Sequence, residues 1–167
     1  MSNFVKATIV SLLLASAFSS QASENNITVQ ASVDPTVSLT LADGSALPST
    51  VTMQYQAGVG LVAYKNNVKL WSNDATKNLQ INLGAIPKLT DQNGANPIEL
   101  AVSLNGVALS TTASTFTAAS LFPGGVNTNG SSPLPLVISQ KTFAPVTTAG
   151  NYSGLVNIVV TQATSGN

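Results

Sequence analysis

Apolar and polar residues alternate with a period of two along most of this chain, whereas helical spacing is scarce. Such a period places successive side chains on opposite faces of a strand, so it predicts β-strands with one buried face. The alternating runs are residues 27–33, 37–41, 51–55, 79–83, 98–104, 107–109, 134–138 and 152–160. Clusters of Asp, Asn, Gly and Pro separate these runs and predict turns. Seven or more short strands joined by regular turns predict an all-β sandwich.

The connections between the runs carry local signals of their own. Asn105-Gly106 lies between two alternating runs and predicts a tight β-hairpin, because both residues tolerate a positive φ. Residues 115–121 are compatible with a single helical turn, and residues 126–133 read as an exposed loop. No internal repeat and no interdomain linker is apparent.

The two ends of the chain are unusual for a sandwich. Residues 27–33 form a strand with a clean apolar face, and Asp34-Pro35 ends it, because proline has no N–H and fixes φ. Residues 155–160 are apolar on both faces, as in a strand at the centre of a sheet. This strand comes almost last in the chain, so its second neighbour must come from elsewhere.

Residues 1–22 read as a targeting segment. Lys6 precedes an apolar run over residues 7–18, which is too short to span a bilayer. Small residues at Ser20 and Ala22 match the pattern that signal peptidase cleaves. We expect cleavage after Ala22, and export from the cytoplasm follows from it.

Composition excludes several classes of function. The six basic residues are all lysines, the six acidic residues balance them, and only 7% of the chain is charged. Neither the basic stripe of a nucleic-acid binder nor the Lys/Arg cluster of an anionic-membrane binder is present. Without cysteine, the domain must be held by packing or by a partner chain.

The residues available for chemistry favour a protein that is not an enzyme. The chain has no His and no Cys, which removes Ser-His-Asp triads, thiolate nucleophiles and imidazole metal ligands. The carboxylates are scattered, and the Asp91-Gln92-Asn93-Gly94 stretch reads as a turn rather than a calcium loop. Trp71, the only tryptophan, fits a packing role better than a sugar platform. We expect no catalytic residue, no cofactor and no metal.

Five segments resemble the major pilins of the alternate chaperone–usher fimbriae, the family of the colonization factor antigen fimbriae and the cable pili. They run in order along the chain, and the first and last of them are the most specific. The segments are residues 24–35, 42–48, 73–77, 109–112 and 148–156.

The resemblance implies an incomplete immunoglobulin-like β-sandwich that is completed by a donated N-terminal strand. Its implied parts are a signal peptide (1–22), a donor strand (23–35) and a pilin domain (36–167). Ile27, Val29, Ala31 and Val33 would be the donor side chains. Because proline interrupts strand pairing, Asp34 and Pro35 are expected to form either a hinge between this strand and the body or a simple turn. The acceptor groove would consist of Tyr152, Gly154, Val156, Ile158 and Val160, with Gly154 leaving room for a neighbouring chain.

The same resemblance implies partners and a location. A periplasmic chaperone would fill the groove first, and identical pilin subunits would replace it at an outer-membrane usher, below a tip adhesin. The product would be a fimbria on the bacterial surface that supports adhesion to host cells, with a host-cell receptor left open.

Two other functions remain to be weighed against this one. A glycan-binding tip adhesin of this kind would be a two-domain protein of about twice this length. A periplasmic β-sandwich enzyme or binding protein would not need an apolar strand before the proline, and it would show clustered acids or aromatics.

Overall fold

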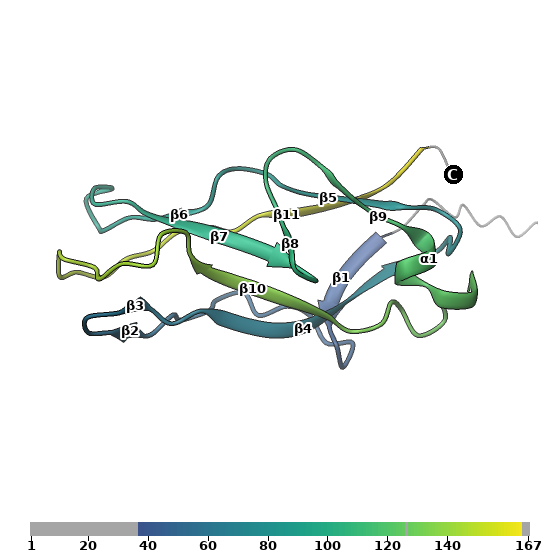
Figure 1. Cartoon of the computed structure of the whole chain (residues 1–167), viewed down its shortest axis with the longest axis horizontal. Helices are drawn as coiled ribbons and strands as arrows, with labels where there is room; N and C mark the ends of the chain where they lie inside the picture. Colours follow the sequence, from purple (N-terminus) through teal and green to yellow (C-terminus); the bar gives the residue numbers. More distant parts are fainter. Residues whose placement is uncertain (1–36, 126, 165–167) are drawn as a thin grey trace, which may run out of the picture. The chain divides into compact units, whose positions relative to one another are not determined.

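The alternating runs fold into two main antiparallel sheets, which the computed structural model describes for residues 37–125 and 127–164 (Figure 1). All of these residues belong to one unit of the chain, residues 33–167. The first sheet has the order β1 (Val37–Leu41), β4 (Tyr64–Ser72), β10 (Leu134–Gln140), β7 (Ile98–Leu104) and β6 (Lys88–Leu89), with β8 (Val107–Ala108) also paired to β7. The second has the order β11 (Ile158–Gln162), β5 (Leu79–Leu83) and β9 (Ser114–Phe116). A hairpin joins β2 (Tyr55–Gln56) to β3 (Gly60–Leu61).

The core lies between the two sheets, and both contribute alternate side chains to it. In β5 and β7 every second residue is buried, as period-two patterning requires. Burying such side chains is the main favourable term in the free energy of folding. The buried cluster consists of Val68, Leu70, Leu79, Ile81, Leu83, Val102, Leu104, Leu109, Phe116, Leu121, Phe122, Leu134 and Leu136.

Local sequence signals are confirmed where they were strongest. Asn105 and Gly106 have φ values of 50° and 79° and join β7 to β8, as an Asn-Gly hairpin should. The single helical turn is α1 (Ala118–Leu121), followed by the 3-10 turn η1 (Pro123–Gly125). No helix in the described part of the chain is long and apolar enough to cross a membrane.

The sequence prediction missed β4, the longest strand. Its first half contains Lys65, Asn66 and Asn67, which disfavour strands, although Val68 and Leu70 are fully buried. Pairing with β1 and β10 on either side overrides that local preference. The alternating run 51–55 shows the opposite error, because only its last residue lies in a strand, β2.

The connection after η1 is less exposed than predicted. Ser131 is buried, and its hydroxyl accepts a hydrogen bond from the amide of Leu70 at 3.0 Å. The neighbouring Gly130 packs tightly against Trp71, since a Cβ atom there would lie 3.0 Å from the indole ring. Trp71 in turn donates from Nε1 to Thr40 Oγ1 at 2.8 Å, across the β1–β4 pair. Trp71 therefore has the packing role expected for it.

Three turns are held by aspartate side chains. Asp91 Oδ1 accepts from the amides of Asn93 and Ala95, and Oδ2 accepts from Asn96 Nδ2 at 2.7 Å. These bonds, with that of Asn96 the largest contribution, hold the pKa of Asp91 below its ordinary value of 3.8. Asp43 and Asp74 make equivalent turns with Ser45 and Thr76, and their pKa values are lowered for the same reason. The turn reading of Asp91 is confirmed.

Replacing Asp91 with asparagine should make the fold less sensitive to acid. Because the folded pKa lies below the unfolded one, the stabilisation is present above about pH 4 and is lost as pH falls through the folded pKa. The Asp91→Asn melting temperature should therefore fall less between pH 5 and pH 2 than that of the parent chain. Thermal melts across this range measure it, and equally steep curves would show that the turn carries no such linkage.

Candidate functional site

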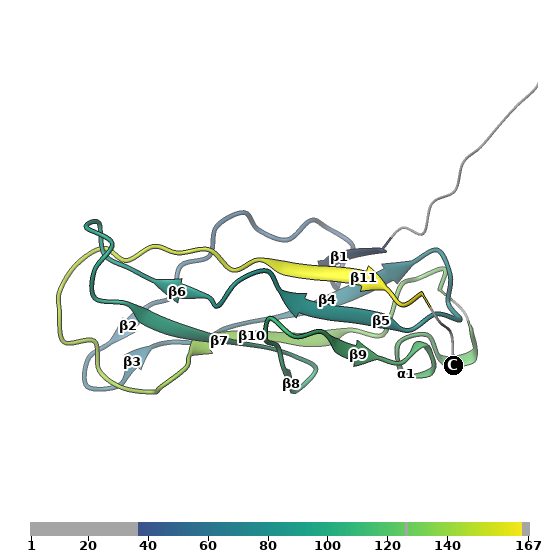
Figure 2. The same cartoon turned by 90° about the horizontal axis from the view of Figure 1, so that it is seen from above.

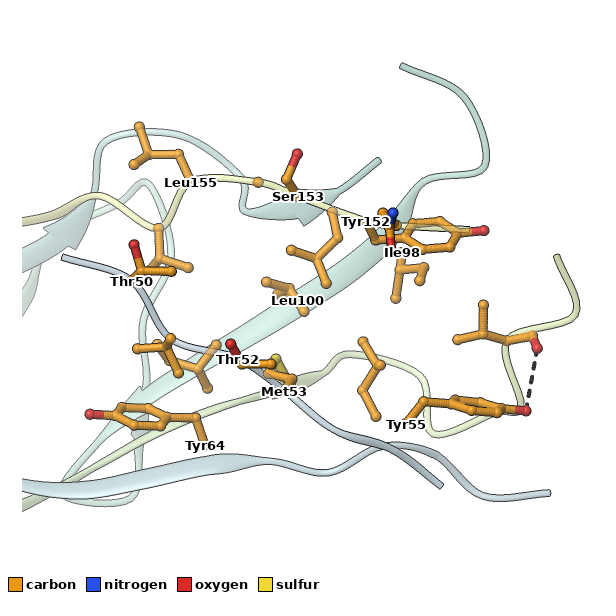
Figure 3. Close-up of a pocket in the computed structure, with 18 of the residues that line it drawn as sticks. Thr50, Thr52, Met53, Tyr55, Tyr64, Ile98, Leu100, Tyr152, Ser153 and Leu155 are labelled. Atoms are coloured by element: carbon orange, nitrogen blue, oxygen red, sulfur yellow. Dashed lines mark hydrogen bonds between the residues drawn. The ribbon is translucent and has the colours of Figure 1, made fainter. Parts of the chain in front are cut away.

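An apolar groove of about 1100 Å³ opens between two chain segments beside the sandwich core. One side, the N-terminal rim, is residues 47–53, and the other, the C-terminal rim, is residues 152–156. The floor is formed by alternate side chains of β7 and β10, namely Ile98, Leu100, Leu136 and Ile138. Figure 3 shows Ile98 and Leu100 between the labelled residues of the two rims. Most of the side chains that line the groove are apolar, as in the place of a missing strand.

The C-terminal rim continues into β11, which has a free edge. β11 pairs with β5, and within the described residues no strand pairs with its other edge. Asn157 accepts from the amide of Gly84 and Ala163 donates to Asn78, so the odd-numbered residues bond to β5. Antiparallel pairs alternate, so the N–H and C=O groups of Ile158 and Val160 point away from β5. Unpaired backbone groups of this kind are a template for another strand.

The N-terminal rim belongs to no strand and has no hydrogen-bonded partner among the described residues. Residues 46–53 make no hydrogen bond to any described residue, and Val51 is 36% exposed. The alternation of Val51 and Met53 with Thr52 suits a strand, but a strand needs a neighbour to bond with. An incoming strand between the rims would supply that neighbour to both sides at once.

The groove contains most of the acceptor residues that the resemblance implied. Tyr152, Gly154, Val156 and Ile158 line it. Val160 is not part of its lining but lies two residues further along β11, where it packs against the core with Val156 and Ile158.

The donor side chains Ile27, Val29, Ala31 and Val33 lie outside the described residues, as do the hinge residues Asp34 and Pro35 and the signal peptide. Their roles stay predictions.

Gly154 is needed for a close approach within this chain, and its expected role beside a neighbouring chain stays a prediction. A Cβ atom at residue 154 would collide with the carbonyl oxygen of Lys88 in β6. Next to it, Ser153 and Thr90 exchange both backbone hydrogen bonds at 2.9 Å. The Ser153–Thr90 pair thus fastens the C-terminal rim at the end of β6, and Gly154 allows that side of the groove to lie so close.

The electrostatics of the groove are uniform. None of its lining residues is charged, while Ser, Thr and Asn stand at its rims. Charged groups lie elsewhere, such as the Lys141–Glu99 ion pair at 2.7 Å, in which the hydrogen bond from Lys141 lowers the pKa of Glu99. No group of three His, Cys, Asp or Glu residues suited to a metal ion occurs within residues 37–125 and 127–164. The groove is built to bury apolar side chains.

The family model for the CS1 type fimbrial major subunit matches residues 23–161, which include both rims of this groove. The chain belongs to this family of fimbrial major subunits. A CFA/I fimbrial subunit of Escherichia coli O78:H11 (strain H10407 / ETEC) is 44% identical over 164 residues, covering 93% of this chain and 96% of that protein. A CS1 fimbrial subunit of Escherichia coli is 37% identical over 171 residues, covering 96% of this chain and 99% of that protein.

A solved structure agrees with this assignment. The CooA pilin subunit from enterotoxigenic Escherichia coli has a TM-score of 0.68 and 32% sequence identity, and the match covers 80% of this chain and 91% of that one. The fimbrial subunit described here is therefore a pilin β-sandwich, a structural protein and not an enzyme, and its place is a fimbria on the cell surface. The tip adhesin and the periplasmic β-sandwich enzyme or binding protein are both set aside.

Sequence reasoning missed half of the groove. The N-terminal rim was read as an ordinary strand, and the floor residues were expected only as core. One signal was available for the rim, since Val51, Met53 and Tyr55 alternate like a strand but follow Pro48. Nothing in the sequence places β7 and β10 beneath the two rims.

Proposed function

We propose that this pilin polymerises by accepting residues 24–34 of a second copy into its groove as a strand between the two rims. The observation that supports this most is the free edge of β11 beside an uncharged apolar groove. Strand addition takes affinity from the backbone ladder and specificity from pockets for alternate side chains. Ile27, Val29, Ala31 and Val33 recur at this period of two.

The energetics favour such an exchange. Each larger donor side chain that is buried in the groove contributes on the order of 1.5–3 kcal/mol, and Ala31 contributes less. One end of the subunit donates and another part accepts, so the contact is heterologous and propagates an open filament. Asp34-Pro35 then serves as the hinge between the donor strand and the body, because the proline interrupts strand pairing.

The remaining steps follow from the same groove. An apolar groove with an unpaired strand edge aggregates if it is left open, so we infer that a periplasmic chaperone covers it after cleavage behind Ala22. Exchange for the donor strand then takes place at an outer-membrane usher, below a tip adhesin. The chain divides accordingly into signal peptide (1–22), donor strand (23–35) and pilin domain (36–167), and the finished shaft supports adhesion to host cells.

Fusing residues 24–35 to the C-terminus through a short flexible linker should give a stable monomer. The fused segment follows β11 and can return along its free edge as an antiparallel strand. Closure within one chain replaces a bimolecular step with a high effective concentration. Thermal melting and size-exclusion chromatography measure the result.

A matched control carries the same fusion with serine at the fused copies of Ile27, Val29 and Val33. It keeps the backbone ladder but loses the apolar side chains, so it should melt well below the intact fusion. If both fusions melt at the temperature of the unfused chain, strand donation is not the mechanism of this pilin.

A further inference from the structure

One end of the groove is bordered by a single loop, residues 142–151, which we call the strap. In both views it runs round the end of the sandwich opposite α1 (Figure 1 and Figure 2). Before it, Lys141 is fixed in two ways. Its backbone amide donates a hydrogen bond to the Glu99 carbonyl at 2.9 Å, and its side chain forms an ion pair with the Glu99 carboxylate. After it, Ser153 is paired to Thr90. Both ends of the strap are thus anchored to the same sheet.

Between these anchors only side chains hold the strap. No backbone group of residues 142–152 bonds to another backbone group in the described chain. Three strap carbonyls accept from side chains instead. Gln140 Nε2 donates to the Ala144 carbonyl at 2.9 Å, and the Tyr152 hydroxyl donates to that of Thr148 at 2.9 Å. The Tyr55 hydroxyl donates to the Val146 carbonyl at 3.4 Å, the dashed line in Figure 3.

The strap borders a second hollow as well as the groove. This second cavity has a volume of about 490 Å³ and is lined by Thr142 and by residues 144–148 of the strap. Val146, Thr147, Thr148 and Tyr152 line both cavities. Protein interiors are normally close-packed, so a segment that borders two cavities lacks many of the contacts that would fix it. No residue of the strap belongs to the buried core cluster, so the strap can shift without disturbing the core.

We propose that Tyr55, Gln140 and Tyr152 are positioning residues that latch the strap over the end of the groove and thereby set the rate at which a donor strand enters. This inference rests on the proposed strand exchange. The three hydrogen bonds have a second consequence. They occupy carbonyl groups near the C-terminal rim that could otherwise accept hydrogen bonds from a strand of an unrelated chain. Entry of the donor strand requires the strap to release, and the rate of release depends on the three side-chain hydrogen bonds.

The test measures strand uptake directly. The probe is a fluorescently labelled synthetic peptide of residues 24–34, added to the full chain purified with the chaperone that covers its groove. Removing one donor should speed uptake by about two- to tenfold, the worth of one hydrogen bond. Tyr152→Phe should act more strongly than Tyr55→Phe, whose bond is longer. Gln140→Glu keeps an acceptor for the Leu61 amide but replaces the donor to Ala144 with a charged oxygen that repels this carbonyl, so it should release the strap most strongly.

The control is Ser110→Ala, which removes a hydroxyl-to-carbonyl bond in a loop outside the groove and should leave uptake unchanged. Melting temperatures of the peptide-filled subunits separate a latch from a merely structural role. If the side chains act as a latch, substituting them raises the uptake rate and leaves the filled subunit nearly as stable as the unsubstituted one. If their role is merely structural, substitution lowers the melting temperature without faster uptake.

The outcomes distinguish the two proposals. If the unsubstituted chain takes up no peptide, the proposed strand exchange is wrong, and the latch proposal that rests on it is wrong as well. If it takes up peptide but the tyrosine and glutamine variants match Ser110→Ala, or are slower than the parent chain, only the latch is overturned.

Discussion

Val29→Asp is expected to abolish polymerisation while leaving the fold of residues 37–164 intact. The substitution places a carboxylate in a groove whose lining contains no charged residue. An unpaired charge buried in such surroundings costs several kcal/mol or more, which exceeds what one apolar side chain gains there. The pilin domain keeps its own core because that core is assembled from β4, β5, β7 and β10.

Gln30→Asp is the matched control, because residue 30 lies on the opposite face of the predicted strand. Electron microscopy of surface filaments and the melting temperature of chaperone-bound subunits measure the two effects separately. We expect filaments with Gln30→Asp and none with Val29→Asp, at similar melting temperatures. Normal filaments with Val29→Asp would mean that this side chain does not enter the groove.

Gly154→Ala should destabilise the subunit through a single added methyl group. Its Cβ atom would collide with the backbone of Lys88, which cannot move without breaking the Thr90–Ser153 pair or shifting β6. Overpacking against backbone costs about 2–3 kcal/mol, which corresponds to a fall in melting temperature of about 10 °C. Because the C-terminal rim would shift, strand uptake should also weaken.

Gly150→Ala provides the comparison within the same segment. A Cβ atom there meets only Tyr152 at 3.6 Å and Asp91 at 4.0 Å, which are ordinary contacts. Both substitutions are made in the fused monomer that carries residues 24–35 at its C-terminus. The melting temperatures of the two variants should differ by most of the fall predicted for Gly154→Ala. Equal melting temperatures would show that the rim relaxes freely at residue 154, and that its close approach does not require Gly154.

Local periodicity was enough to predict several strands, because each buries one face in the same core. Residues 37–41, 79–83, 98–104 and 134–138 all lie in strands, and the Asn105-Gly106 hairpin has the predicted backbone. β4 could not be predicted this way, since strands on either side stabilise a sequence with poor local preference for strand.

The last predicted strand was right in type but too early in its start. β11 begins at Ile158, whereas the prediction began at Tyr152. Residues 154–157 remain outside a strand, apart from the bond between Asn157 and Gly84. A strand assignment requires a bonded neighbour, and the groove leaves this segment without one on its free side.

The sequence by itself determined that this chain is an all-β domain, and it predicts an apolar first strand ended by a proline and a final strand in need of a neighbour. Those features depend on local alternation and on the chemistry of proline. Only the tertiary structure decided where the free edge of β11 lies, that residues 47–53 form the facing rim, and that the strap borders one end. These depend on contacts between residues far apart in the chain, such as Tyr55 with Val146 and Lys88 with Gly154, which no local pattern encodes.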